Sequence, residues 1–350
     1  MVQEQQGYRL HEWGGDLCWE TFPRPGPAQG EVLVRVDACG IGLTVLNYLA
    51  GNLSTDPSLL PRVPGHEVAG TVVDAGAGVD RRLLGRQVVA YFYLSCGGCS
   101  ACLAGDEPRC RDLAGWVGTH RDGGYAPWAV LPARSVIPVP EGLDPVAATV
   151  VPDALATPVH VCQRRARIVP GDRVVVIGAG GGVGIHTTQV AQLLGGRVLG
   201  VDLTSEKLEL VERFGAVPAD GGRLPSVDAA SLLDGPPTVV IDLVGTGDTL
   251  AWGTAVLDGG GRLVLVTTVR DGRLELLARD VVFREIAVLG SRYARRSEVA
   301  TAAELVRSGR VRPVIGSVVE PEGVPGAHAD LRAGTLLGRG AVRWDHAQSI

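Results

Sequence analysis

Two patterns of hydrophobic and polar residues divide the chain near residue 153. The first 150 residues carry short β-branched or aromatic runs separated by Gly, Pro and Asp, which predicts a mostly β structure. The runs behind this prediction are residues 31–38, 67–76, 87–94 and 125–132. A polar, proline-rich stretch at residues 132–144 closes this part of the chain.

From Asp153 onward, continuous apolar runs alternate with helical patterns. Runs that are apolar at nearly every position predict strands covered on both faces, here residues 172–179, 197–202, 238–245, 262–269 and 285–291. Helical spacing falls between them at residues 184–195, 205–216 and 249–257, with Ser205 expected as an N-cap and Gly215 as a C-cap. This order predicts an α/β fold with a parallel, doubly wound sheet. An amphipathic helix is expected over residues 298–311, and a β-like end with one short helix after it.

Composition adds limits on domain count and partners. A chain of 350 residues corresponds to about two domains. With 33 basic and 38 acidic residues interspersed, the net charge of −5 argues against nucleic acid and anionic membranes as partners. The sequence shows neither a basic-then-apolar leader nor an apolar run of about 18 residues, so we expect no membrane association and a cytoplasmic location.

A glycine-rich segment follows the strand expected at residues 172–179. Small residues let a backbone approach a pyrophosphate, and a helix N-terminus offers N–H groups and a positive dipole end. The glycines fit two registers, Gly178-x-Gly180 or the preferred Ala179-x-Gly181-x-x-Gly184. The loop is therefore treated as one cofactor-binding unit that comprises Gly178, Gly180, Gly181, Gly182, Val183 and Gly184.

Asp202 strengthens the case for a dinucleotide over a simple tight turn. It closes the next expected strand, 18 residues after Gly184, where a carboxylate accepts hydrogen bonds from both ribose hydroxyls. Leu203 and Thr204 follow it, and neither is an arginine that could receive a 2′-phosphate. The sequence therefore predicts NAD(H) in preference to NADP(H).

Four of the seven cysteines lie close together. Cys96, Cys99, Cys102 and Cys110 have a spacing that wraps four thiolates around one ion, and a tetrahedral four-sulfur site without an open position is a structural zinc site. Oxidised pairs and an iron–sulfur cluster remain alternatives.

Taken together, the motifs resemble the medium-chain, zinc-containing alcohol dehydrogenases. The resemblance rests on PGHEVAG at 64–70, the four-cysteine lobe, DGGYA at 122–126, GAGGGVG at 178–184, VVIDLVG at 239–245 and LRAGTLLGRGAV at 331–342. It implies a GroES-like β-barrel catalytic domain at residues 1–153 and 294–350, with the zinc lobe at about 94–112, and a Rossmann-type NAD-binding domain at 154–293. It also implies a homodimer or homotetramer built partly through Rossmann edge strands, and it adds Lys207 and Val244 to the cofactor site.

The stretch DACGIGLTVLN, residues 37–47, departs from the family pattern. The family usually reads Cys-Gly-x-Cys-x-Ser/Thr-Asp here, and its second cysteine is a ligand of the catalytic zinc. Gly42 stands at that position and Val45 at the Asp position, while Thr44 matches the hydroxyl that relays the proton. Asn47 stands where many members carry a relay histidine, and Cys39 is expected to be a small buried thiol.

The other catalytic ligands of the family have counterparts. His66 and Glu67 match Gly-His-Glu, and Asp153 matches the third ligand in the branch that uses Asp. Two readings stay open: a weakened catalytic zinc held by these groups, or an empty site in which His66, Thr44 and Asp153 form a polar cluster. The expected substrate pocket consists of Leu43, Asn47, Tyr48, Phe92 and Trp116.

These features predict a first function and two alternatives. The first is NAD(H)-dependent interconversion of a secondary alcohol and a ketone, with Thr44, His66, Glu67 and Asp153 as catalytic residues. The second is zinc-independent reduction of an α,β-unsaturated carbonyl or iminium, motivated by Gly42. The third is a non-catalytic dinucleotide-binding protein. The expected partner is accordingly a small alcohol, ketone or enone.

Overall fold

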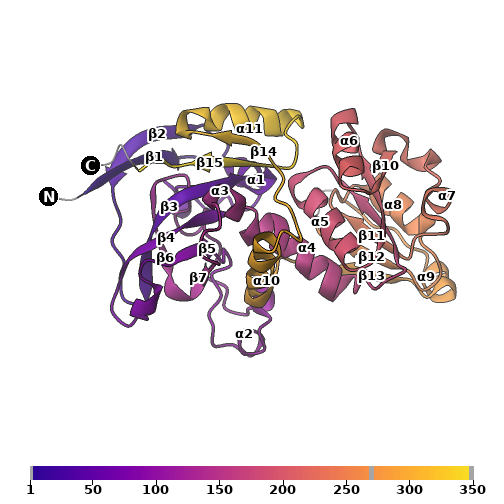
Figure 1. Cartoon of the computed structure of the whole chain (residues 1–350), viewed down its shortest axis with the longest axis horizontal. Helices are drawn as coiled ribbons and strands as arrows, with labels where there is room; N and C mark the ends of the chain where they lie inside the picture. The colour runs from indigo at the N-terminus through magenta and orange to yellow at the C-terminus, as the bar shows by residue number, and fades with distance from the viewer. Residues whose placement is uncertain (1–2, 268–271, 347–350) are drawn as a thin grey trace. The chain divides into compact units, whose positions relative to one another are not determined.

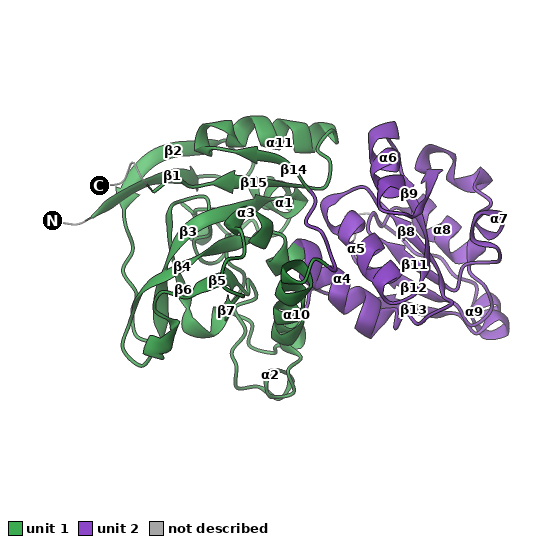
Figure 2. Ribbon diagram, viewed as in Figure 1, with its two compact units in different colours: residues 1–153, 295–309, 315–350 green, residues 154–294, 310–314 purple. Residues whose placement is uncertain are grey.

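A computed structural model describes residues 3–267 and 272–346, which form two compact units (Figures 1 and 2). The first comprises residues 1–153, 295–309 and 315–350, and the second comprises 154–294 and 310–314. The family resemblance implied that 294–350 would lie wholly in the first domain. Residues 310–314 join the second unit because the Val314 N–H donates to His186 Nε2 (3.1 Å) and the Arg312 N–H donates to Gln189 Oε1 (2.9 Å).

The long strand β3 organises the first unit, because it pairs with β4, β6 and β15. The main sheet has the order β14-β15-β3-β4-β5-β7, and β1 and β2 form a separate antiparallel hairpin. The strands are β1 (Glu4–Leu10), β2 (Leu17–Pro23), β3 (Glu31–Ile41), β4 (Val68–Ala75), β5 (Gln87–Ala90), β6 (Trp128–Pro132), β7 (Val136–Pro138), β14 (Ile315–Val319) and β15 (Arg339–Arg343). The helices are α1 (Leu43–Leu49), α2 (Ser100–Leu103), α3 (Pro145–Ala148), α10 (Arg296–Arg307) and α11 (Val324–Ala333).

The second unit is an all-parallel six-stranded sheet with the order β10-β9-β8-β11-β12-β13, which confirms the doubly wound sheet. Its strands are β8 (Arg173–Ile177), β9 (Arg197–Asp202), β10 (Val217–Asp220), β11 (Val239–Asp242), β12 (Arg262–Leu265) and β13 (Ala287–Gly290). Its helices are α4 (Ala156–His160), α5 (Gly182–Leu193), α6 (Ser205–Arg213), α7 (Ala229–Leu233), α8 (Gly247–Val256) and α9 (Ala278–Arg284). A π-helical turn, η5 (Val151–Leu155), spans the boundary between the units, and a second, η6 (Val161–Arg165), follows α4.

Helices cover both faces of this parallel sheet, and the buried residues show why. Val175 and Ile177 of β8 share a core cluster with Leu250 and Trp252 of α8. On the opposite face, a Cβ at Gly200 of β9 would lie 2.6 Å from Val211 of α6. Both faces of each central strand are therefore buried, which explains the continuous apolar runs in the sequence.

Several boundaries differ from the sequence-based expectations. The N-cap of α6 is Thr204, not Ser205, because the Thr204 backbone is extended and its hydroxyl accepts from the Lys207 N–H at 3.4 Å. The strand expected at 87–94 ends at Ala90, after which the Tyr91 N–H donates to Ser135 O. Residues 268 and 269, the end of the strand expected at 262–269, lie outside the described residues.

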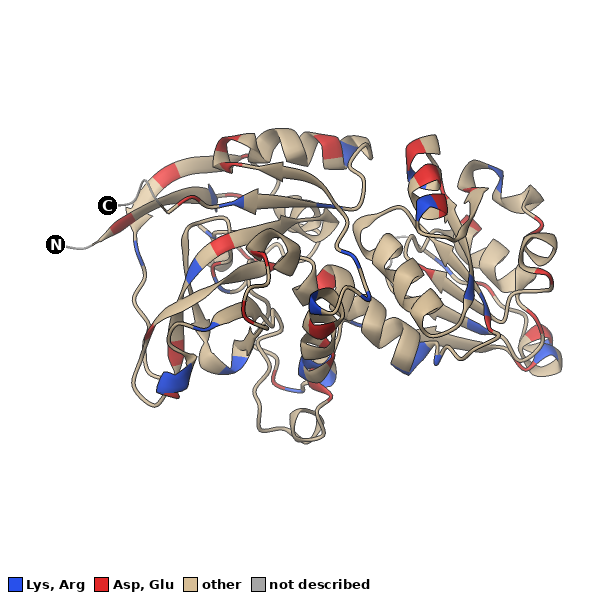
Figure 3. Ribbon diagram, viewed as in Figure 1, with Lys and Arg blue, Asp and Glu red and all other residues tan. Residues whose placement is uncertain are grey.

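Acidic and basic side chains are interspersed within each unit, in keeping with their similar numbers (Figure 3). Within the described ranges, none of the helices combines the length and apolar character needed to cross a bilayer.

Candidate functional site

The glycine loop of the second unit joins β8 to α5 at the carboxyl edge of the sheet. Gly178 has a left-handed backbone (φ 82°), and a Cβ at Gly184 would lie 2.0 Å from Gly178 O. Glycine at both positions lets α5 begin directly on the turn. The N-cap of α5 is Gly181, which has no side chain to cap the helix, so the first N–H groups keep their capacity to bind an anion.

Asp202 ends β9 beside this loop. Its Oδ2 accepts from the Gly180 N–H at 2.8 Å, and Lys207 Nζ lies 3.8 Å from its Oδ1. Val244, which follows β11, lies beside Gly178. The residues predicted to bind the nucleotide therefore gather at the carboxyl ends of β8, β9 and β11, where the strand order reverses.

The four clustered cysteines of the first unit have the geometry of a closed metal site. Their sulfur atoms lie within 4.8 Å of one another, with Cys96–Cys102 at 3.9 Å and Cys99–Cys110 at 4.0 Å. A tetrahedron with Zn–S bonds of about 2.3 Å requires S···S separations of about 3.8 Å. Hydrogen bonds from the backbone N–H groups of Arg111 and Cys102 lower the pKa of the Cys99 thiol to about 6. All four are free thiols, and their arrangement fits zinc rather than disulfides.

A second polar cluster of the first unit brings three predicted catalytic residues together. The ligand atoms of His66, Glu67 and Asp153 lie within 4.8 Å of one another, and His66 Nε2 is 3.3 Å from Asp153 Oδ2. Because an ionised carboxylate only accepts, this contact requires the proton on Nε2. Asp153 lies in the π-helical turn η5, a rare backbone form that is common at functional sites. In the part of the chain that the structure describes, the Thr44 hydroxyl makes no hydrogen bond to this cluster.

Arg339, which is not among the predicted site residues, completes this cluster. Its Nε donates to Glu67 Oε2 at 2.7 Å, and its Nη2 lies 3.5 Å from Asp153 Oδ2. Burial alone would lower the pKa of Arg339, but Glu67 and Asp153 raise the pKa above its ordinary value. The signal in the sequence is one arginine inside an otherwise small and apolar β-like run, GRGAV at 338–342.

Arg339 also explains Gly42. A Cβ on Gly42 would lie 2.2 Å from Arg339 Cζ, so the guanidinium fills the space that any side chain at position 42 would enter. A catalytic zinc at this cluster would lack the thiolate and would meet carboxylates that already bind a fixed positive charge. The cluster therefore offers a weaker donor set for zinc than the four cysteines, although the ligand atoms of its three residues lie within 4.8 Å of one another.

The predicted pocket residues are only partly brought together. Phe92 packs edge-on against His66, with ring centroids 4.6 Å apart. Trp116 instead contacts His120 and Tyr93, and Tyr48 packs on Trp13. The remaining two, Leu43 and Asn47, are exposed on α1.

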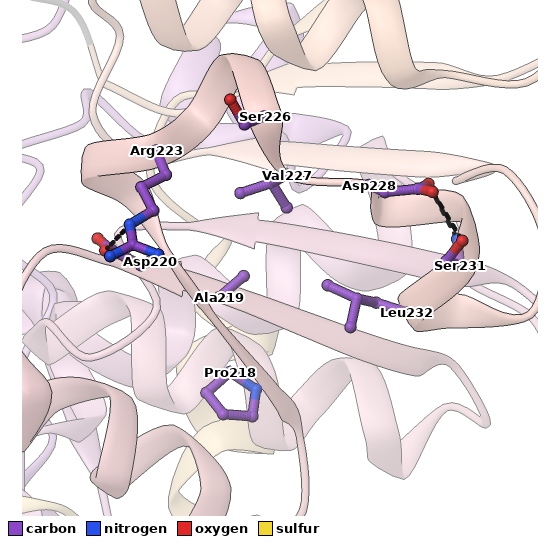
Figure 4. A pocket seen from close by; sticks show the side chains of 9 residues that line it. All are labelled: Pro218, Ala219, Asp220, Arg223, Ser226, Val227, Asp228, Ser231 and Leu232. Carbon is purple, nitrogen blue, oxygen red and sulfur yellow. Dashed lines mark hydrogen bonds and ion pairs between the residues drawn. The ribbon is translucent and has the colours of Figure 1, made fainter.

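A separate hollow of about 460 Å³ lies beside the edge strand β10 of the second unit (Figure 4). Its polar groups already pair with one another: Arg223 Nε lies 3.4 Å from Asp220 Oδ2, and the Ser231 hydroxyl donates to Asp228 at 2.7 Å. None of the predicted site residues lines it, so it does not compete with the two clusters above.

Comparisons with known proteins identify the family. A model described as "Alcohol dehydrogenase GroES-like domain" matches residues 28–141, and one described as "Zinc-binding dehydrogenase" matches residues 182–308. An acryloyl-coenzyme A reductase of Metallosphaera sedula is 31% identical over 96% of both chains. An alcohol dehydrogenase of Geobacillus stearothermophilus is 32% identical over 94% of this chain and 96% of its own.

A solved structure agrees with these sequence matches. The cobalt- and zinc-bound thermostable alcohol dehydrogenase from Pyrobaculum aerophilum has a TM-score of 0.87 and 31% identity, and the match covers 98% of this chain and all of that one. The sequence-based fold of a GroES-like domain plus a Rossmann-type domain is confirmed. With near-complete coverage at more than 30% identity, the chain belongs to the zinc-containing medium-chain dehydrogenase/reductase superfamily and is an oxidoreductase.

Proposed function

We propose that this oxidoreductase uses NAD(H) to reduce a carbon–carbon double bond conjugated to a carbonyl group. The observation that carries the proposal is Arg339, whose guanidinium pairs with Glu67 and Asp153 where the family's thiolate is missing at Gly42. Hydride addition to an isolated carbonyl puts a full negative charge on oxygen, which calls for a strong electrophile such as zinc. In a conjugated substrate the charge spreads toward a remote oxygen, and hydrogen-bond donors suffice.

Relatives support this substrate class. Two acryloyl-coenzyme A reductases, from Sulfurisphaera tokodaii and Metallosphaera sedula, are 29% and 31% identical to this chain over nearly its whole length. The substrate in their names is an α,β-unsaturated thioester. An unsaturated carbonyl of this kind fits a site that polarises oxygen without a metal.

The residues take the following roles in the proposal. The loop at 178–184 holds the pyrophosphate, Asp202 accepts from the ribose hydroxyls with Lys207 beside it, and Val244 lines the cofactor. NADH held by these residues would supply a hydride from C4 of its nicotinamide for the β-carbon of the substrate. The Thr44 hydroxyl donates a hydrogen bond to the carbonyl oxygen as the enolate charge develops there, while the N–H of His66 stays on Asp153. A proton from solvent then reaches the α-carbon, which leaves a saturated carbonyl product and NAD⁺.

Zinc at the four cysteines has a structural role in this proposal. Cys96, Cys99, Cys102 and Cys110 would saturate its tetrahedral coordination, so the ion would hold the lobe at 94–112 and take no part in turnover.

A second candidate is the alcohol–ketone interconversion that the sequence analysis placed first. The mutual distance of the ligand atoms of His66, Glu67 and Asp153, within 4.8 Å, favours it, as does the 32%-identical alcohol dehydrogenase. Without zinc, Thr44 and His66 would have to stabilise the alkoxide alone, which makes it the weaker candidate.

A matched pair of ketones separates the two candidates. Methyl vinyl ketone and methyl ethyl ketone differ only in the conjugated double bond, so each is incubated with the purified protein and NADH carrying deuterium at C4. We expect oxidation of NADH with the vinyl ketone only, and NMR should find deuterium on its β-carbon. Comparable reduction of methyl ethyl ketone would instead establish the second candidate, and turnover of neither, nor of acryloyl-coenzyme A, would contradict both.

A further inference from the structure

The guanidinium of Arg339 is buried and lies against the backbone of Gly42. In the pairing of β15 with β3, Gly340 faces Ile41, so Arg339 follows in register next to Gly42. Its side chain runs into the space over Gly42 and is only 5% exposed. A charge so deeply buried is tolerated only when opposite charges and hydrogen bonds compensate it.

Two carboxylates provide that compensation. Glu67, which is fully buried, accepts from Arg339 Nε at 2.7 Å, and Asp153 lies 3.5 Å from Nη2 while it also faces His66 at 3.3 Å. The Nη2 atom itself is buried and has no hydrogen-bond partner of good geometry among the described residues. The guanidinium thus touches two of the three groups that a metal ion would use, and the third group points its N–H at Asp153.

We infer that Arg339 is the resident cation of this site: it replaces the catalytic zinc of the family, and it excludes a metal ion as long as residue 42 is glycine. Gly42 and Arg339 act as a pair. Gly42 supplies the space and removes the thiolate, while the guanidinium neutralises the charges of Glu67 and Asp153. The inference concerns only what occupies the site, so it holds for either substrate of the proposed function.

A bound zinc would have to undo all of these contacts. It would need a lone pair of Glu67 that now accepts from Arg339, and a place next to a fixed positive charge. The four-cysteine site has none of these conflicts. One metal ion per chain is therefore expected where the family pattern would hold two.

Metal stoichiometry tests the inference without any activity assay. The full chain is loaded with excess zinc, dialysed and analysed by mass spectrometry of the metal, and a cadmium-loaded sample is examined by cadmium NMR, which separates four-thiolate sites from oxygen- and nitrogen-rich sites. We expect one equivalent and one thiolate-type resonance in the wild type, and no metal in Cys99→Ser. Two equivalents, with a second resonance that disappears in Asp153→Asn, would overturn the inference.

A double variant tests the pairing of the two residues. Gly42→Cys/Arg339→Ala restores a thiolate and removes the guanidinium, so it should take up a second equivalent, whereas Arg339→Lys, which keeps the positive charge, should stay at one. Folding is checked by circular dichroism and by NADH binding in the other unit. A folded double variant that still holds one equivalent would refute the role of Arg339.

If the double variant does not fold, wild-type crystals soaked in zinc decide the question. Anomalous scattering at the four cysteines alone supports the inference, and a second peak between His66 and Asp153 overturns it. Failure of the proposed reductase activity would appear separately, in the ketone assay, with the metal count unchanged.

Discussion

The absence of a single side chain at Gly42 changes the charge balance of a buried site. Without a Cβ there, the guanidinium of Arg339 reaches Glu67, and the two charges become mutually dependent. Removing one partner of a buried ion pair typically costs about 3–5 kcal/mol, because the other charge is left uncompensated. Gly42 is therefore important because its lack of a side chain leaves space for the guanidinium of Arg339.

Asp202 is predicted to set the preference for NADH over NADPH. Replacing it by Ala removes the acceptor for the ribose hydroxyls and the repulsion of a 2′-phosphate, so the KM for NADH should rise about tenfold to a hundredfold while NADPH becomes a competent donor. The measurement is the ratio of kcat/KM for the two cofactors.

Asp220→Ala is the matched control for this prediction. Asp220 faces Asp202 in the adjacent strand β10, but its carboxylate pairs with Arg223 instead of the glycine loop. The control should keep the wild-type preference. An Asp202→Ala protein that still rejects NADPH would contradict the assignment of this carboxylate.

Site residues whose partners lie nearby in the sequence could be predicted from the sequence. Site residues whose partners lie far along the chain could not. The four cysteines lie within 15 positions, so their spacing alone indicates one ion. Glu67 and Arg339 are 272 positions apart, and only the pairing of β15 with β3 brings the arginine to Gly42. His66 and Asp153 were grouped through the family resemblance, which carries no information on a replacement cation.

At the scale of elements, the four-cysteine lobe has little regular structure to hold it. Between residues 94 and 112 it contains only α2, with four residues, and a 3₁₀ turn (Glu107–Arg109). Its attachment to α10 includes an ion pair of Arg295 with Asp106 at 3.4 Å. A metal ion would therefore supply much of the cohesion of this segment.

Loss of that ion should loosen the lobe. Cys99→Ser, or treatment of the wild type with a chelator, should release one zinc per chain, lower Tm and expose residues 94–112 to limited proteolysis. Cys18→Ser is the control, because Cys18 is exposed in β2 and outside the cluster. Retention of zinc by Cys99→Ser would show that the cysteines do not form the site.

Helix α11 contributes a pH-dependent contact to the first unit. His328 Nε2 lies 2.9 Å from the buried Tyr125 hydroxyl, and burial, with Arg332 nearby, lowers the pKa of His328 to about 4. An unfolded histidine titrates near 6.5, so between pH 6.5 and 4 the unfolded chain binds more protons than the folded one. Stability should therefore fall as the pH drops through this range, by up to about 3 kcal/mol, and level off below it.

Unfolding by urea at a series of pH values measures this effect. His328→Gln should flatten the decline between pH 6.5 and 4, whereas His11→Gln should leave it unchanged, because His11 is exposed in an ion pair with Glu20. An unaltered slope in His328→Gln would assign the acid sensitivity to other groups.

Strands that are buried on both faces were predicted more accurately than the half-buried edge strand. Strands β8, β9, β11 and β12 are covered on both faces, and their apolar runs predicted them to within a few residues. Strand β10 was missed because it is a half-buried edge strand that contains Pro218. Tertiary context, which the local pattern lacks, decides such edges.

At the scale of the molecule, the parallel sheet ends in a strand with an open side. β13 is last in the strand order, so no described strand pairs with its outer edge, and α9 precedes it in the chain (Figure 1). Val282 and Phe283 of α9 are 68% and 81% exposed, and Val288 of β13 is 38% exposed. Exposed apolar residues beside an unpaired edge are typical of an interface between protein chains.

The final prediction is therefore a homodimer or homotetramer that uses this edge of the second unit. Light scattering after size-exclusion chromatography should give two or four chains per particle at micromolar concentration. Phe283→Glu would place a charge in the contact and should weaken association at least about tenfold, since an unpaired charge at an interface costs more than 1.4 kcal/mol. Leu103→Glu, at a residue 77% exposed in the cysteine lobe, should leave the mass unchanged. A monomeric wild type, or equal masses for Phe283→Glu and the wild type, would mean that the apolar surface of α9 serves something other than self-association.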